Sequence, residues 1–246
     1  MAGEAVYVYG IVAAGEPLEV PTGVEGGAVS LQEGEGIAAI VSRVPDRPVR
    51  TTRRDLQAHA AVLAAALEQR NAVLPMRFGV MLPSPAAVEA EVLVGARAEL
   101  EALLAQFAGT VEFELKALYP DQEALLEQVV HSNPRIAQLR GRAGYHDQIE
   151  LGELVASALE DERRKDEALL LERLSPLALD TRAKEELPER MAAKLSFLVE
   201  RARHEALEAE AELLAEECHP RLQLRLDGPL PPHNFVDLAL PAGAAA

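Results

Sequence analysis

Residues 73–79 read Val-Leu-Pro-Met-Arg-Phe-Gly, and this stretch decides how the first half of the chain is organised. Its apolar residues predict a short strand, but Pro75 has no amide hydrogen to donate to a neighbouring strand. We therefore expect the stretch at the edge of a sheet or at a bulge. A helix leads into it, because Thr52 and Asp55 form a start similar to a capping box and apolar residues follow at helical spacing until Asn71.

The elements around this stretch predict one sheet with two helices. Two strands precede the first helix, at about residues 6–11 and 37–41. The glycine-rich sequence between them, residues 23–36, is expected to form a surface turn. A second helix begins at Ser84-Pro85, and a half-exposed strand follows it at residues 111–115. This order predicts an N-terminal domain over residues 1–118, with a ferredoxin-like sheet and helices packed on one face.

The second half, residues 119–246, predicts a helix-rich α+β domain. Helices are expected at about residues 121–130, 134–140 and 147–174. A strand, a helix and another strand follow, at residues 191–199, up to 217, and 222–226. We interpret them as a βαβ unit with parallel strands. The proline-rich segment 228–232 is expected to end the last strand, and the alanine-rich tail 242–246 is expected to be disordered. The predicted fold class is therefore α+β, in two domains.

Composition and charge exclude several kinds of partner. The chain has 24 basic and 40 acidic residues, a net charge of −16, which disfavours binding to nucleic acid or to an anionic membrane. Its single cysteine, Cys218, cannot form a disulfide within the chain and fits a reducing, cytoplasmic compartment. No apolar run approaches the roughly 18 residues that a membrane-spanning helix needs, so membrane insertion is not expected.

Motifs for catalysis or metal binding are not found in the sequence. The glycine-rich stretch lacks the spacing of a phosphate-binding loop, and Cys218-His219 is only one pair, whereas a structural metal site needs about four ligands. We therefore expect no catalytic residue, no metal and no cofactor. His59 lies on the apolar side of its helix, where a buried structural histidine is the favoured interpretation over a functional one.

Four separated motifs together resemble one family. They are Tyr7-Val8-Tyr9-Gly10-Ile11-Val12, the stretch 73–79 preceded by His59, Leu195-Ser196-Phe197-Leu198-Val199-Glu200-Arg201, and Gly228-Pro229-Leu230-Pro231-Pro232-His233-Asn234-Phe235-Val236. In this order they resemble gas vesicle proteins F and L over nearly the whole chain. The closing motif departs from the family pattern, which usually has Trp at Leu230 and Tyr at His233.

The resemblance implies an accessory role in the assembly of gas vesicles, which are protein-walled, gas-filled compartments. It implies binding to the small hydrophobic shell protein and to other accessory proteins, without catalysis, and a location in the cytoplasm and at the gas vesicle. The candidate interaction or motif residues are His59, Pro75, Met76, Arg77, Phe78, Gly79, Gly228, Pro229, Pro231, Pro232 and Phe235.

Each candidate segment has a structural interpretation as well. For residues 75–79, an architectural turn and a site where a partner adds a strand are equally favoured. For residues 228–235, a latch that folds back onto the body is favoured over an interface. A second hypothesis for the whole chain is a small-molecule-sensing or regulatory α+β domain, whose pocket His59 and Arg77 would supply only in part.

Overall fold

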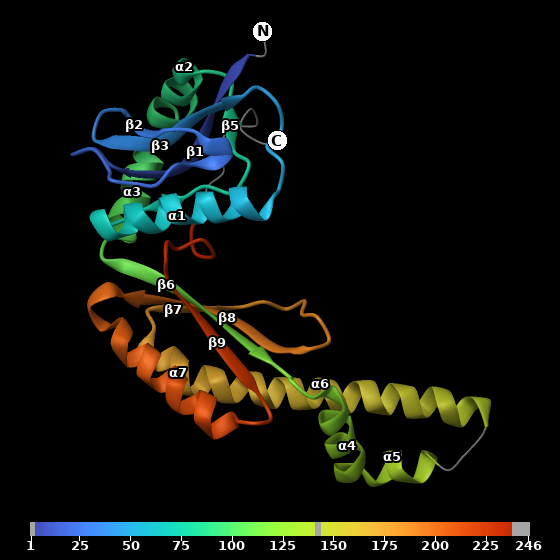
Figure 1. The fold of residues 1–246 in the computed structure, drawn as a ribbon. Coiled ribbons are helices and arrows are strands. Elements are labelled where there is room, and N and C mark those ends of the chain that lie inside the picture. The colour runs from blue at the N-terminus through green and yellow to red at the C-terminus, as the bar shows by residue number, and fades with distance from the viewer. Residues whose placement is uncertain (1–2, 141–143, 238–246) are drawn as a thin grey trace. The chain divides into compact units, whose positions relative to one another are not determined.

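The computed structural model describes residues 3–140 and 144–237, and it divides the chain into two compact units. One unit comprises Met1–Glu112 together with Pro229–Ala246, and the other comprises Phe113–Gly228. The closing segment therefore belongs to the first unit, whereas the sequence assigned it to the second. The α+β class is confirmed, with helices and antiparallel sheets in the fold (Figure 1). The alanine-rich tail lies outside the described residues.

The first unit is built on a sheet in which β1 is central. Its strands are β1 (Glu4–Ala13), β2 (Val29–Glu33), β3 (Ile37–Pro45), β4 (Leu74–Pro75) and β5 (Met81–Leu82). The order is β2-β3-β1-β4. β5 pairs with a different part of β1, at Val6 and Tyr7, on the same side as β4. All these pairings are antiparallel. Eight of the ten residues of β1 are buried, so both faces of the sheet are covered there.

Helices lie along both faces of this sheet, whereas the sequence predicted them on one face. They are α1 (Arg53–Gln69), α2 (Pro85–Ala87), a π-helical segment (Val88–Val94) and α3 (Arg97–Gln106). The predicted cap of α1 is confirmed, because the Thr52 hydroxyl accepts a hydrogen bond from the Asp55 amide at 3.1 Å. Figure 1 shows α1 below the sheet and α2 above it. The single helix expected from Ser84 is thus divided into three consecutive helical segments.

The prediction of a plain turn at residues 23–36 is wrong. This stretch contains a short 3-10 helix, Val24–Gly26, and the edge strand β2. Glycine content hid the strand, although Val29 and Leu31 alternate with Ser30 and Gln32 as a strand requires. Tertiary pairing with β3 supplies the stability that local sequence lacks.

The second unit has a four-stranded sheet in the order β7-β8-β6-β9. Its strands are β6 (Thr110–Leu118), β7 (Asp180–Ala183), β8 (Met191–Glu200) and β9 (Gln223–Leu230). Its helices are α4 (Gln122–Ser132), α5 (Pro134–Leu139), α6 (Tyr145–Leu174) and α7 (His204–Cys218). β7 was not foreseen, because its four residues carry almost no apolar pattern. The three predicted helices between residues 121 and 174 are confirmed.

The βαβ unit formed by β8, α7 and β9 is split. β6 lies between the two strands and is antiparallel to both, so β8 and β9 are parallel to each other without being neighbours. The expectation that residues 228–232 cannot continue the last strand is wrong for its first part, because β9 extends through Pro229 to Leu230. An edge strand tolerates proline, whose missing amide can face away from the sheet.

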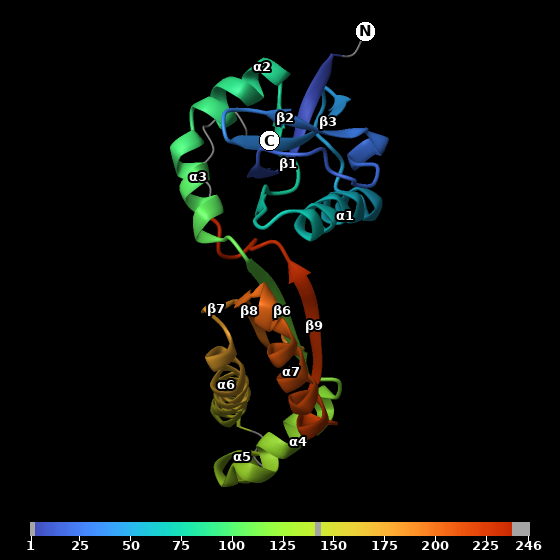
Figure 2. The ribbon, with the colours of Figure 1, turned by 90° about the vertical axis from the view of Figure 1, so that its left-hand side faces the viewer.

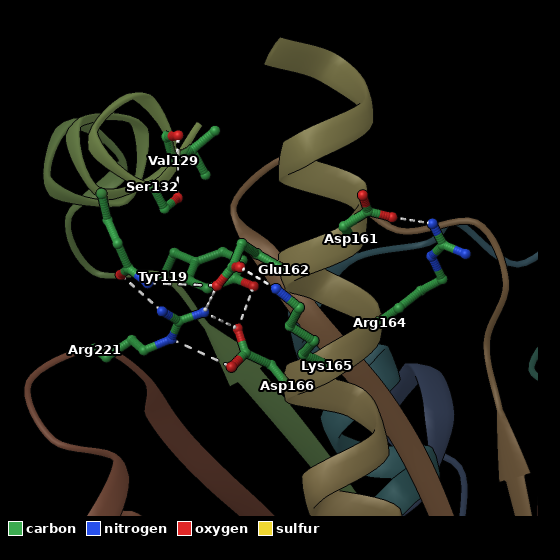
Figure 3. Close-up of polar contacts among 10 residues, drawn as sticks. Tyr119, Val129, Ser132, Asp161, Glu162, Arg164, Lys165, Asp166 and Arg221 are labelled. Carbon is green, nitrogen blue, oxygen red and sulfur yellow. Dashed lines mark hydrogen bonds and ion pairs between the residues drawn. The ribbon is translucent and has the colours of Figure 1, made fainter. Parts of the chain in front are cut away.

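A charged cluster holds the helices of the second unit to its sheet (Figure 3). Arg221 donates to Asp166 at 2.8 Å, to Glu162 at 2.8 Å and to Gln128 at 2.7 Å, and the Tyr119 hydroxyl donates to Asp166 at 2.6 Å. Asp166 is only 7% exposed, so these donors compensate the desolvation of its charge. The cluster thereby joins α4, α6, the end of β6 and the turn after α7.

Gly23 provides a strict test of packing in the first unit. A Cβ added at Gly23 would lie 2.0 Å from the hydroxyl oxygen of Tyr9, which is fully buried. We therefore expect Gly23→Ala to lower the free energy of unfolding by about 2–3 kcal/mol, because neither group can move freely. Urea unfolding monitored by circular dichroism measures this change.

Gly79→Ala is the matched control for Gly23→Ala. Gly79 has a φ of +95° and open space around an added Cβ, so only backbone strain of about 1 kcal/mol is expected. A larger loss for Gly79→Ala than for Gly23→Ala would contradict the packing argument.

Candidate interaction site

A buried hydrogen bond joins β1 to α1 in the first unit. The Tyr7 hydroxyl lies 2.9 Å from Nδ1 of His59, and it accepts a hydrogen bond from the Gly79 amide at 3.0 Å. Tyr7 has no exposed surface, and His59 is 6% exposed. With Gly79 as its donor, the hydroxyl is placed to give its own hydrogen to Nδ1, which puts the histidine proton on Nε2.

Burial keeps His59 neutral. Burial first, and then the charge of His233, lower the pKa of His59 to about 4, and the backbone carbonyl of Met76 acts in the opposite direction. Burial likewise raises the pKa of the Tyr7 and Tyr9 hydroxyls above the usual tyrosine value. The group therefore works as a neutral hydrogen-bonded core and has no charge to offer a substrate at neutral pH.

Aromatic rings complete the cluster. The ring of Phe78 meets those of Tyr7 and His59 edge to face, with centroids 6.0 and 5.8 Å apart, and Tyr9 stacks on His59 at 5.5 Å. The Tyr9 hydroxyl contacts Ser42 Oγ at 2.8 Å and accepts from the Val24 amide at 2.8 Å. We call Tyr7, Tyr9, His59 and Phe78 the aromatic–histidine cluster.

The stretch 73–79 is attached to β1 on both sides of its turn. The Met76 amide donates to the Tyr9 carbonyl at 2.8 Å, and the Val8 amide donates to the Val80 carbonyl at 3.0 Å. Pro75 and Met76 are buried, Phe78 and Gly79 are half-buried, and Arg77 is exposed. Of these predicted residues, Arg77 is the one whose side chain is free to reach a partner.

The closing segment packs onto the first unit. The amide and side-chain nitrogens of Asn234 both donate to the carboxylate of Glu112, the first at 2.8 Å. Glu112 is only 1% exposed, so a charge-assisted pair of hydrogen bonds holds the segment at a desolvated anchor. Pro231, Pro232 and Phe235 are buried beside it.

Gly228 and Pro229 have a different role from the rest of the closing motif. A Cβ added at Gly228 would lie 2.3 Å from the ring of Phe113, so glycine is the residue that lets β9 approach this ring. Pro229 is the next residue of the same edge strand and is exposed. The closing motif is thus divided between the two units. Residues 231–235 lie in the first unit, as residues 75–79 do, whereas Gly228 packs in the second.

Accessible apolar grooves lie on both faces of edge strand β2. A groove of about 550 Å³ on one face of β2 is lined by Val6, Val41, Pro85 and the strand itself. A second groove, of about 310 Å³, lies on the other face beside Leu18 and Ile40. This site was not predicted from the sequence, because residues 23–36 were predicted to form a turn. The alternation of apolar and polar residues from Val29 to Glu33 was the pattern that indicated a strand.

Fold and site together define a class of protein: an α+β chain of two units, with hydrogen-bonded clusters in its interior and apolar grooves beside an edge strand. Within residues 3–140 and 144–237, no group of three or more His, Cys, Asp or Glu side chains could hold a metal ion. No helix within the same residues is long and apolar enough to cross a membrane.

Comparisons with known proteins identify the family. The sequence profile described as "Gas vesicle synthesis protein GvpL/GvpF" matches residues 5–237. Gas vesicle protein F of a Streptomyces species is 37% identical over 246 residues, covering 95% of this chain and 100% of that protein. Gas vesicle protein F2 of Halobacterium salinarum is 27% identical, covering 100% and 98%. The chain belongs to the gas vesicle protein F and L family.

Solved structures agree on the fold. The crystal structure of gas vesicle protein F from an Anabaena species superposes with a TM-score of 0.85 at 24% identity, covering 96% of this chain and 100% of that one. The crystal structure of the Microcystis aeruginosa protein superposes with a TM-score of 0.82 at 21% identity, covering 95% and 99%. The fold resemblance therefore extends over both units.

The neutral state of His59 predicts how stability depends on pH. An unfolded histidine titrates near pH 6.5, so between about pH 6.5 and 4 the unfolded chain binds a proton that the folded chain does not. Stability conferred by His59 is present above this window and is lost as pH falls through it. We expect His59→Gln to remove this component. As the pH falls from 7 to 4.5, the free energy of unfolding of the variant should therefore rise by about 2 kcal/mol relative to that of wild type.

Urea unfolding at the two pH values measures this gain. Glutamine can still accept from the Tyr7 hydroxyl, and Tyr9, Met76 and His233 around it stay unchanged in both proteins. His146→Gln, which removes an exposed histidine, is the matched control. An equal stability difference between His59→Gln and wild type at both pH values would show that His59 does not carry the effect.

The anchor of the closing segment gives a second test. Asn234→Ala removes one of the two hydrogen bonds described to the buried Glu112 carboxylate, and we expect a loss of about 1–3 kcal/mol in the free energy of unfolding. Limited proteolysis should cut the variant faster between Pro231 and Val236. Unchanged stability and cleavage would mean that burial of Phe235 alone holds the segment.

Proposed function

We propose that this chain is an accessory factor in gas vesicle assembly, which binds the small hydrophobic shell protein and other accessory proteins without catalysing a reaction. Membership of the gas vesicle protein F and L family supports the vesicle context. Its place of action is then the cytoplasm and the growing vesicle. The binding surface proposed for the shell protein is edge strand β2 with the two grooves beside it.

The free edge of β2 is the observation that carries this proposal. β2 is the last strand on its side of the sheet, and among the strands of the described residues it pairs with β3 alone. The opposite edge is occupied by β4 and β5, which have two residues each, and buried Pro75 has no amide to donate. A partner strand finds a longer run of free backbone groups at β2 than at the Pro75 edge, for which the sequence favoured an architectural turn and a strand-addition site equally.

Physical chemistry explains why such a surface would serve assembly. A shell protein with a strongly apolar face aggregates unless that face or its sheet edges are covered. The grooves offer apolar cover through the half-buried side chains of Leu18, Val29 and Leu31, and the backbone of β2 offers hydrogen bonds. The net charge of −16 then keeps separate complexes apart in solution.

The rival hypothesis of a small-molecule-sensing domain receives less support. Its pocket would need convergent polar groups, and His59 and Arg77 were the candidates. His59 is buried and bonded to Tyr7, whereas the side chain of Arg77 is exposed. Neither side chain lines the grooves described beside β2.

Co-purification tests the proposal. We expect the shell protein, expressed together with this chain in a host that lacks vesicles, to be recovered in a soluble complex. Leu31→Lys places a charge in the groove beside β2, and we expect it to reduce recovery of the shell protein at least about fivefold, because burying an unpaired charge is costly.

The matched control is Leu56→Lys, the same change at an exposed leucine of α1. Circular dichroism and the thermal midpoint confirm that both variants fold. Recovery that is equal for both variants would reject β2 as the binding edge, and recovery of the shell protein in soluble form without this chain would reject the assembly role itself.

A further inference from the structure

A groove lies between α7 and the edge of the second sheet. Its floor is made of Leu115 from β6 and Leu224 and Leu226 from β9, and its volume is about 390 Å³. Leu115 is fully buried, whereas Leu224 and Leu226 are half-buried. Apolar surface therefore remains accessible where the sheet ends.

The wall of the groove is acidic. α7 contributes Ala211 and Ala215 next to the floor and Glu208 and Glu212 above it, and no lysine or arginine lines the groove. Glu208 contacts His204 at 3.0 Å, whereas Glu212 is exposed and makes no ion pair with a described residue. The carboxylate of Glu212 is thus available to a partner.

The strand that borders the groove has an open edge. β9 is the last strand of the order β7-β8-β6-β9, and Figure 2 shows it along the margin of its sheet with α7 in front. Backbone groups of Gln223 to Gly228 that point away from β6 are therefore unpaired by the sheet. Pro229 limits any added strand to this part of β9.

Charges on the other face of the sheet are already compensated. Lys116 pairs with Glu114 at 2.6 Å and with Asp227 at 3.1 Å, and Arg225 pairs with Asp227 at 2.9 Å. Because side chains alternate along a strand, Leu224 and Leu226 lie on the face toward α7. These ion pairs thus occupy the face away from α7, while the apolar side chains of β9 lie toward α7.

We propose that this groove binds an extended segment of another protein, added alongside β9, whose groove-facing side chains combine apolar residues with lysine or arginine. Every second residue of such a segment points toward α7, where apolar side chains cover Leu224 and Leu226 and basic ones reach Glu212 and Glu208. Charge complementarity selects this partner over an acidic one. The site is in the second unit and does not depend on the function proposed for β2.

Two peptides of about nine residues test the proposal. In the first, groove-facing lysine and valine alternate with threonine, as Thr-Lys-Thr-Val-Thr-Lys-Thr-Val-Thr. In the second, the same residues are rearranged so that lysines and valines are adjacent and the two-residue period is lost. We expect the full chain to bind the first in a fluorescence anisotropy titration at least about tenfold more tightly than the second.

Glu212→Lys reverses a charge at the groove and is expected to weaken binding of the first peptide about tenfold. Glu68→Lys, at an exposed position of α1, changes the net charge equally and is expected to change affinity less than about twofold. Amide hydrogen exchange should slow in residues 223–228 when the first peptide binds.

Several results would overturn the proposal. They are failure of the first peptide to bind, equal binding of both peptides, equal weakening by Glu212→Lys and Glu68→Lys, or binding without protection of residues 223–228. A dimer in sedimentation, with residues 223–228 protected before any peptide is added, would show instead that a second copy covers the edge.

Discussion

The hydrogen bond between the Tyr7 hydroxyl and Nδ1 of His59 is the constraint on which the first unit depends. It lies in a space closed to water, so it must be satisfied in one geometry, and that geometry positions three elements at once. β1 contributes Tyr7, α1 contributes His59, and the turn at Gly79 donates the third hydrogen bond. Phe78 and Tyr9 then pack around a histidine that burial keeps uncharged.

The second unit uses a different solution for the same problem. Its helices are held by a charged cluster in which Arg221 and Tyr119 compensate the buried carboxylate of Asp166. Each unit thus has a buried polar cluster that joins its helices to its sheet. Apolar grooves lie beside the edge strands β2 and β9, a distribution suited to binding extended protein segments.

Much of the fold could be predicted from local pattern. Thr52 and Asp55 mark the start of α1, and Pro75 places its strand at an edge, because capping and proline geometry act within a few residues. β2 and β7 could not be predicted in the same way. Each is short and weakly apolar, and each is stabilised by the strand beside it.

The sequence by itself determined the α+β class, the family motifs and the acidic charge, since these reside in residue type and spacing. Only the tertiary structure decided where the motifs meet. Packing brings Phe78 against His59 and fastens Asn234 to Glu112, although 122 positions separate that last pair along the chain. Contacts between distant residues depend on how strands are ordered and which groups lose water, and neither is written in local pattern.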